Sequence, residues 1–146
     1  MTGELTDDDT AAIRFLIEHS ELRSIEHYEM SARRYDAPPA DDAPDNGQVN
    51  IVVQQRSDED SFGVRLNAKI VIPLGEVEVS VAGEYALLDP AALTPRSLQL
   101  FANEVAVMTV FPYLREAVAS ITGRVFQQQL HLPMISRGQI VVDVTE

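Results

Sequence analysis

Residues 94–126 limit the possible fold more than any other part of the sequence. Residues 105–114 carry no charge, and their apolar side chains fall on every side of a helical projection: Val105, Val107, Met108, Val110, Phe111 and Leu114. A helix that is apolar all round has to be covered on more than one side. The rest of this chain supplies a sheet for one side, so we expect another subunit to cover the other.

The chain before this helix predicts an antiparallel sheet with one solvated face. Residues 61–72 and 76–87 alternate apolar and polar side chains, which is typical of half-buried strands. The second of these strands places Glu76, Glu78 and Glu84 on its outward face. Weaker patterns predict strands at residues 22–35 and 48–55. The strand at 48–55 carries Val49, Ile51 and Val53 on one face.

The turn between the two long strands is constrained by parity. Apolar residues are even-numbered before the turn and odd-numbered after it. Because directly opposed residues share a face, the loop contains an even number of residues. A four-residue loop at 73–76 pairs Ile72 with Val77 and sets Arg65 opposite Glu84. We prefer it to a two-residue loop, because Pro73 cannot adopt the positive φ of a primed turn.

The remaining segments complete a single α+β domain over residues 1–146. Residues 8–19 predict a short amphipathic helix within an N-terminal extension, 1–20. Residues 37–47, APPADDAPDNG, predict a mobile surface loop. Thr94 and Pro95 suit a helix start, and Pro112 predicts a kink, or two abutting helices, near 109–112. Residues 138–144 predict a short strand or an ordered tail.

Composition excludes several classes of partner. The formal net charge is −12, and so acidic a chain lacks the basic patches that bind nucleic acid or anionic membranes. The sequence contains no cysteine, which rules out disulfides and thiolate metal sites. The N-terminal residues do not resemble a signal peptide, and no apolar run approaches the roughly 20 residues that span a bilayer. We therefore expect a cytoplasmic protein that does not insert into membranes.

No constellation of residues indicates an enzyme. His19, His27 and His131 are far apart in sequence and lack metal-ligand spacing. Glycine-rich phosphate motifs and nucleophile elbows do not occur in the sequence. The aspartates of the 37–47 loop lack the EF-hand pattern and its closing glutamate. The sequence predicts no catalytic residue, no metal and no cofactor, which leaves apolar surface as the basis of function.

Residues 110–118, VFPYLREAV, resemble a hallmark segment of the SecB protein-export chaperone family. The family carries Phe-Pro-Tyr-Ala-Arg-Glu in its long helix, and here Leu114 replaces the alanine. Arg124 and a leucine-rich connector with Leu130, Leu132 and Pro133 follow, as they do in the family. The upstream order of strands, proline-rich loop and turns also matches, so the resemblance covers about residues 22–135.

The resemblance implies a four-stranded antiparallel sheet with Greek-key-like connections and a long helix. Subunits would pair into a continuous layer of strands, and two dimers would pack through their long helices into a homotetramer. The interface positions implied on that helix are Val107, Val110, Phe111, Leu114 and Val118.

The implied function is ATP-independent holding of unfolded polypeptides in apolar grooves. Val49, Ile51 and Val53 match the family's groove strand, and Tyr113 matches its motif tyrosine. The outward Glu76, Glu78 and Glu84 are candidates for contact with the SecA translocation motor. Apolar grooves supply non-directional attraction, and exposed strand edges add backbone hydrogen bonds.

Two departures from the family keep alternatives open. The family's C-terminal helix and motor-binding tail are not visible in GQIVVDVTE, and this chain adds an N-terminal helix. SecB-like relatives in toxin–antitoxin systems hold an antitoxin in place of a preprotein. The clients are therefore preproteins for export or an antitoxin. A scaffold oligomer that binds one folded partner is the alternative from another functional class.

Overall fold

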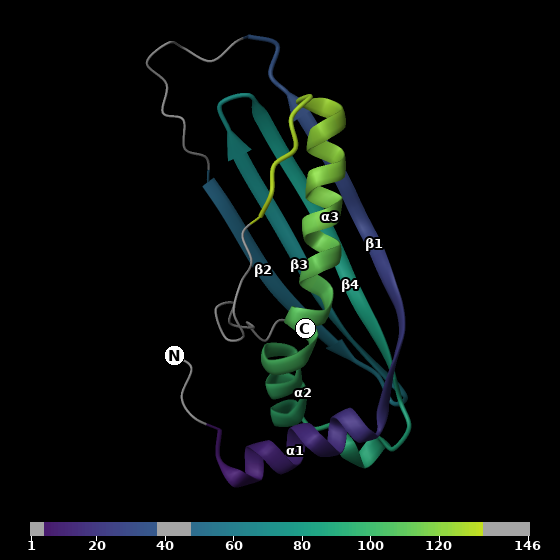
Figure 1. Cartoon of the computed structure of the whole chain (residues 1–146). Helices are drawn as coiled ribbons and strands as arrows, with labels where there is room; N and C mark the ends of the chain where they lie inside the picture. The colour runs from purple at the N-terminus through teal and green to yellow at the C-terminus, as the bar shows by residue number, and fades with distance from the viewer. Residues whose placement is uncertain (1–4, 38–47, 133–146) are drawn as a thin grey trace.

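The computed structural model describes residues 5–37 and 48–132 (Figure 1). The helices and strands are α1 (Asp7–Glu18), β1 (Ser20–Arg34), β2 (Gln48–Ser57), β3 (Ser61–Ile72), β4 (Gly75–Leu87), the 3₁₀-helix η1 (Pro90–Ala92), α2 (Pro95–Phe101), the π-helix η2 (Ala102–Ala106) and α3 (Val107–Val125). The predicted N-terminal helix and the four strands predicted between residues 22 and 87 are confirmed. Residues 38–47 of the predicted loop, and the predicted strand or tail at 138–144, lie outside the described residues.

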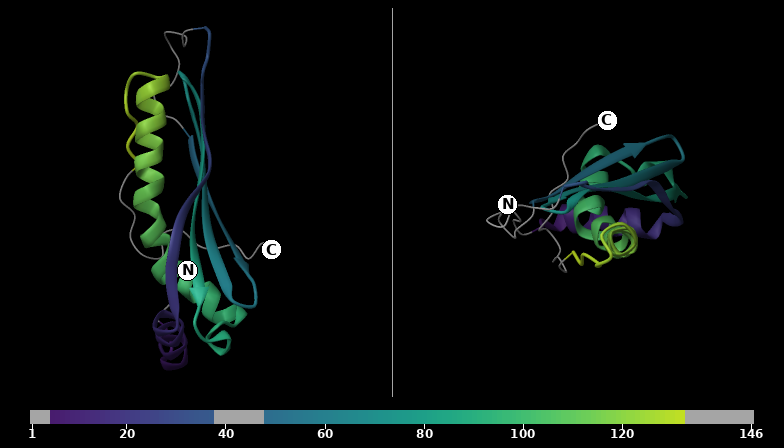
Figure 2. Two further views of the ribbon diagram at one scale, coloured as in Figure 1. Left: turned by 90° about the vertical axis from the view of Figure 1, so that its right-hand side faces the viewer. Right: turned by 90° about the horizontal axis from the view of Figure 1, so that it is seen from above.

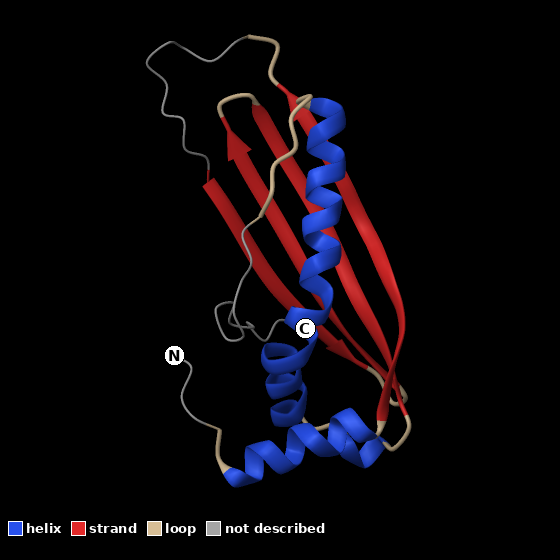
Figure 3. Cartoon of the chain, viewed as in Figure 1, coloured by secondary structure: helices blue, strands red, loops and turns tan. Residues whose placement is uncertain are grey.

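The strands form one antiparallel sheet with the order β1-β4-β3-β2. β2, β3 and β4 follow one another as hairpins, and β1 lies beside β4, which is a Greek-key order. The sheet and α3 form two layers, with α3 along one face of the sheet (Figures 2 and 3). The predicted α+β architecture is confirmed, and β1 and β2 are the edge strands of this sheet.

The β3–β4 turn corrects one expectation. Ile72 pairs with Gly75, so Pro73 and Leu74 alone make the loop, and the predicted four-residue loop is wrong. Neither loop residue has a positive φ, so the turn is not of the primed type that proline forbids. Proline at the second turn position and glycine at the fourth suit a type I turn. Arg65 consequently lies opposite Ala82, and its guanidinium donates a hydrogen bond to the Ser80 hydroxyl.

The irregularity of the long helix lies before the predicted position. The Thr94 hydroxyl accepts a hydrogen bond from the Ser97 amide at 3.0 Å and caps α2. The π-helix η2 then joins α2 to α3, and Pro112 lies inside α3. The predicted break at 109–112 is thus replaced by a π segment at Ala102–Ala106. Wide π turns are a recognised site of helix irregularity that needs no proline.

The core lies between α3 and the sheet. α3 packs on β4, β1 and β3, and the core side chains include Phe62, Leu66, Val79, Val81, Val110 and Leu114, all 1% exposed or less. The helical stretch Pro95–Val125 is long and apolar enough to cross a membrane by length and composition alone. Core helices pass the same test, and this one buries one side against the sheet.

Candidate functional site

The β2 strand exposes apolar side chains on the face that α3 covers elsewhere. Val49 is 53% exposed and Ile51 is half-buried, whereas Val53 is only 1% exposed. All three lie opposite buried β3 residues, Ile70, Ala68 and Leu66, so they share the helix face of the sheet. The accessible surface therefore comes from Val49 and Ile51. Val53 belongs to the core of this chain and does not offer a client-binding surface.

Tyr113 lies on α3 and is 45% exposed. Its helix packs on β4, β1 and β3, with at most marginal contact to β2. Residues 127–132 run back alongside α3 on the side nearer β2 (Figure 1), where Arg115 Nε donates to the Leu132 carbonyl at 2.7 Å. Leu132 is buried in the core. Residues two apart on a helix do not face the same side, so Tyr113 points away from the connector that Arg115 contacts and is not brought together with Val49 and Ile51.

The expected interface residues of α3 are all buried inside the single chain. Val107, Val110, Phe111, Leu114 and Val118 are each 2% exposed or less and belong to the core under the sheet. Side chains without accessible surface cannot contact a second subunit. An interface on α3 has to use the opposite side, where Val105 and Met108 are half-buried and Pro112 is exposed.

The outward glutamates form ion pairs on the face of the sheet that α3 does not cover. Glu76 binds Arg33 at 3.2 Å, Glu78 lies 3.8 Å from Lys69, and Glu84 binds Arg56. Sequence reasoning set Glu84 opposite Arg65, but Arg65 stacks on Tyr28, with its guanidinium carbon 4.3 Å from the ring centroid. Because each carboxylate already has a cation, this face presents mixed charge and not an acidic patch.

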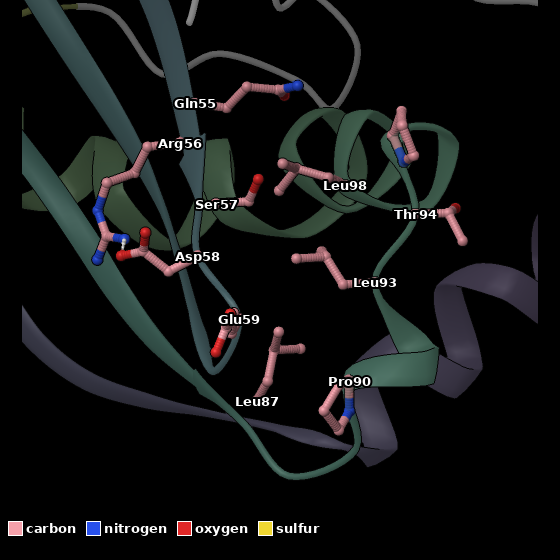
Figure 4. A pocket seen from close by; sticks show the side chains of 11 residues that line it. Gln55, Arg56, Ser57, Asp58, Glu59, Leu87, Pro90, Leu93, Thr94 and Leu98 are labelled. Carbon is pink, nitrogen blue, oxygen red and sulfur yellow. Dashed lines mark hydrogen bonds and ion pairs between the residues drawn. The ribbon is translucent and has the colours of Figure 1, made fainter.

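A hollow that sequence reasoning missed lies between the end of β2 and the start of α2 (Figure 4). Its volume is about 810 Å³, and its lining combines apolar side chains from the η1–α2 segment with polar ones from the β2–β3 hairpin. The lining residues are Gln55, Arg56, Ser57, Asp58, Glu59, Leu87, Pro90, Leu93, Thr94, Pro95 and Leu98. One signal was present in the sequence: Gln55 continues the apolar alternation of Val49, Ile51 and Val53 with a polar side chain.

Two ionisable groups in the described residues have displaced pKa values. Burial raises the pKa of the Tyr85 phenol, and the nearby Thr109 hydroxyl acts in the opposite direction. The Arg96 guanidinium holds the pKa of Asp9 below its usual value, where it ties α1 to α2. Neither group lines the hollow. Within the described residues, no group of three or more His, Cys, Asp or Glu side chains is placed to hold a metal ion.

Two known proteins that are similar to this chain are described as SecB-like chaperones. No family model matches the chain. It is 27% identical over 128 residues to the SecB-like chaperone SmegB of Mycolicibacterium smegmatis, across 88% of this chain and 84% of that protein. The Mycobacterium tuberculosis Rv1957 SecB-like chaperone, solved in complex with a ChAD peptide from the Rv1956 HigA1 antitoxin, superposes with a TM-score of 0.69. That match has 20% identity and covers 90% of this chain and 100% of that one. In sequence this chain is similar to one SecB-like chaperone, and its fold matches that of a second.

Proposed function

We propose that this chain is a chaperone that holds an unfolded polypeptide segment without using a nucleotide. The observation that carries the proposal is the exposed apolar surface of β2, where Val49 and Ile51 remain accessible on an edge strand. Among the described residues β2 pairs only with β3, so its outer backbone edge is open to an extended client. The similarity to two SecB-like chaperones supports the proposal.

An antitoxin is the client that the observations favour over an exported preprotein. The similar Mycobacterium tuberculosis chaperone is bound to an antitoxin peptide. Motor contact through Glu76, Glu78 and Glu84 is weakened as a hypothesis, because each glutamate is paired with a basic residue of its own sheet. We propose that the protein acts in the cytoplasm as a homotetramer, with the exposed side of α3 between dimers.

The test uses two charge-matched double variants on the same strand. Val49→Glu with Ile51→Glu places carboxylates on the client face, and Asn50→Glu with Val52→Glu places them on the opposite face, where both residues are exposed. Loss of about 2 kcal/mol of apolar contact corresponds to roughly thirtyfold weaker binding. We expect this loss of binding for the Val49→Glu, Ile51→Glu pair only. The measurement is how well each variant suppresses aggregation of a non-folding polypeptide.

Other outcomes identify other functions. Equal holding by both double variants and the unmodified protein would remove β2 from the client site. Saturable binding of one folded protein, with no effect on any unfolded polypeptide, would instead favour a scaffold. Light scattering on both variants checks that the assembly is unchanged, so that lost holding reports on the client face.

A further inference from the structure

The hollow between β2 and α2 has the composition of a site for a short peptide segment. Leu87, Leu93 and Leu98 supply its apolar part, and Ser57, Asp58 and Glu59 supply polar groups from the β2–β3 hairpin (Figure 4). Its volume of about 810 Å³ falls within the range of roughly 300–1,000 Å³ that is usual for ligand pockets. The hollow therefore has room for a side chain together with its flanking backbone.

Gln55 gives this hollow an unused hydrogen-bond acceptor. Its side chain extends from β2 toward α2 (Figure 4), and the residue is only 7% exposed. Its Oε1 atom is buried and has no hydrogen-bond partner among the described residues. A buried acceptor without a partner costs the folded protein free energy, so its position beside a cavity points to a donor supplied by a ligand.

The charges around the hollow favour a basic ligand. Asp58 binds Arg56 at 3.1 Å, but the same guanidinium also binds Glu84, so one cation is shared between two carboxylates. Glu59 is exposed and forms no ion pair among the described residues. The hairpin side of the hollow thus carries an excess of negative charge.

We propose that this hollow binds a client segment in which an apolar side chain stands next to lysine or arginine. The apolar side chain packs among Leu87, Leu93 and Leu98, and the basic side chain pairs with Glu59. A backbone amide of the client donates a hydrogen bond to Gln55 Oε1. This inference rests on the proposed chaperone function and adds to it a sequence preference that the apolar surface of β2 does not supply.

The experiment compares two capped peptides, Ac-Ser-Leu-Lys-Leu-Lys-Ser-amide and the same peptide with glutamate in place of lysine. Binding is followed through the backbone amide signals of Ser57, Leu93 and Leu98 in the full chain. We expect saturable shifts with the lysine peptide and none with the glutamate peptide. Glu59→Gln should weaken binding of the lysine peptide about threefold at low salt. This difference in affinity should shrink at about 0.5 M salt, because salt screens exposed ion pairs. Glu116→Gln, an exposed carboxylate on α3, is the matched control.

Gln55→Met separates ligand binding from a structural role. The variant keeps the shape of the side chain and removes the unpartnered acceptor, so we expect the melting temperature to rise while the lysine peptide binds about fivefold more weakly. A purely structural glutamine would not change stability and binding in opposite directions. Gln54→Met, at the neighbouring exposed position, should leave the affinity for the peptide unchanged.

Three results would overturn the inference. If both peptides bind equally and Gln55→Met has no effect on either, while a long non-folding polypeptide still binds through Val49 and Ile51, this inference fails and the proposed function stands. If no peptide or polypeptide binds, both fail together. If Gln55→Met shifts the amide signals of residues 133–146 in the peptide-free protein, the chain's own C-terminal segment occupies the hollow.

Discussion

Two buried side-chain oxygens in the described residues have no hydrogen-bond partner, Gln55 Oε1 and Tyr85 Oη, and their surroundings differ. Gln55 borders a hollow that a ligand can enter. Tyr85 is instead enclosed by aromatic rings, stacked on Phe62 at 4.9 Å and edge-on to Phe101 at 5.1 Å between centroids. Burial raises the pKa of its phenol, since the charged form would lose its hydration. The Tyr85 hydroxyl therefore lowers the stability of the core and is not placed to bind a ligand.

Tyr85→Phe tests this interpretation. The ring contacts remain and the unpartnered hydroxyl is removed, so we expect the free energy of unfolding to stay unchanged or to rise by up to about 1 kcal/mol. Chemical denaturation of the variant and of the unmodified protein measures the difference. A loss of stability greater than about 1 kcal/mol would show that the Thr109 hydroxyl makes a real hydrogen bond to the phenol.

Asp9 and Arg96 give α1 a pH-dependent attachment. Arg96 Nε and Nη2 donate to the two carboxylate oxygens of Asp9 at 3.3 and 3.1 Å, and they hold its pKa below the ordinary 3.8. A lowered carboxyl pKa stabilises the fold above the unfolded pKa, and the effect disappears as the pH falls through the folded pKa. Asp9→Asn should therefore lower the melting temperature at neutral pH and have no effect well below pH 3.8. A difference that persists in acid would rule out the ion pair as its cause.

At the scale of elements, the distance between α3 and the sheet is set at Gly83 on β4. A Cβ atom there would lie 3.0 Å from Val110 Cγ2 and 3.3 Å from Tyr85 Cε1, both within the packed core. A Cβ at Gly63 would instead meet the Glu84 carboxylate at 2.8 Å, at the end of a flexible side chain on the other face. The two glycines thus face neighbours that differ in their freedom to move.

Gly83→Ala should destabilise the protein by about 1–3 kcal/mol, because the helix cannot withdraw without losing core contacts. The pair Gly83→Ala with Val110→Ala should cost less than the sum of the two single changes, since Val110→Ala removes the atom that the new methyl group meets. Gly63→Ala is the matched comparison and should cost less, with the Glu84 side chain moving away. Thermal unfolding of these three variants and of Val110→Ala alone measures the differences, and strictly additive effects of the pair would argue against the contact.

Periodicity predicted the helices and strands but not the geometry of the segments that connect them. Alternation along residues 61–72 and 76–87 identified the strands and the parity of their pairing. The turn was misassigned because a primed geometry was assumed, whereas Pro73 begins an ordinary turn. The π segment at Ala102–Ala106 has no sequence signature of its own, so the expected break was assigned to Pro112. Burial of α3 on its own sheet depends on the distance between layers, which no single-sequence pattern contains.

At the scale of the whole molecule, the side of α3 away from the sheet is the remaining candidate for an interface. Val105, Met108, Pro112 and Ala119 follow helical spacing, and none of them is fully buried in the single chain. Tyr113 borders this stripe and is 45% exposed. The sequence resemblance predicted helix-to-helix assembly, and the structure moves the candidate residues to the opposite side from those first expected. A helix apolar all round fits both the core on one side and a partner on the other.

Met108→Glu and Val110→Asp should separate the two sides of this helix. Met108 is half-buried, so a carboxylate there stays hydrated in the free subunit and opposes only association. We expect a folded, smaller species by light scattering, with unchanged circular dichroism. Val110 is fully buried against the sheet, and a charge there should unfold the subunit itself, because nothing in the surrounding core compensates it. An unmodified protein that is already monomeric, or a Met108→Glu variant of full assembled mass, would place the assembly surface elsewhere and leave α3 as a helix of the monomer core alone.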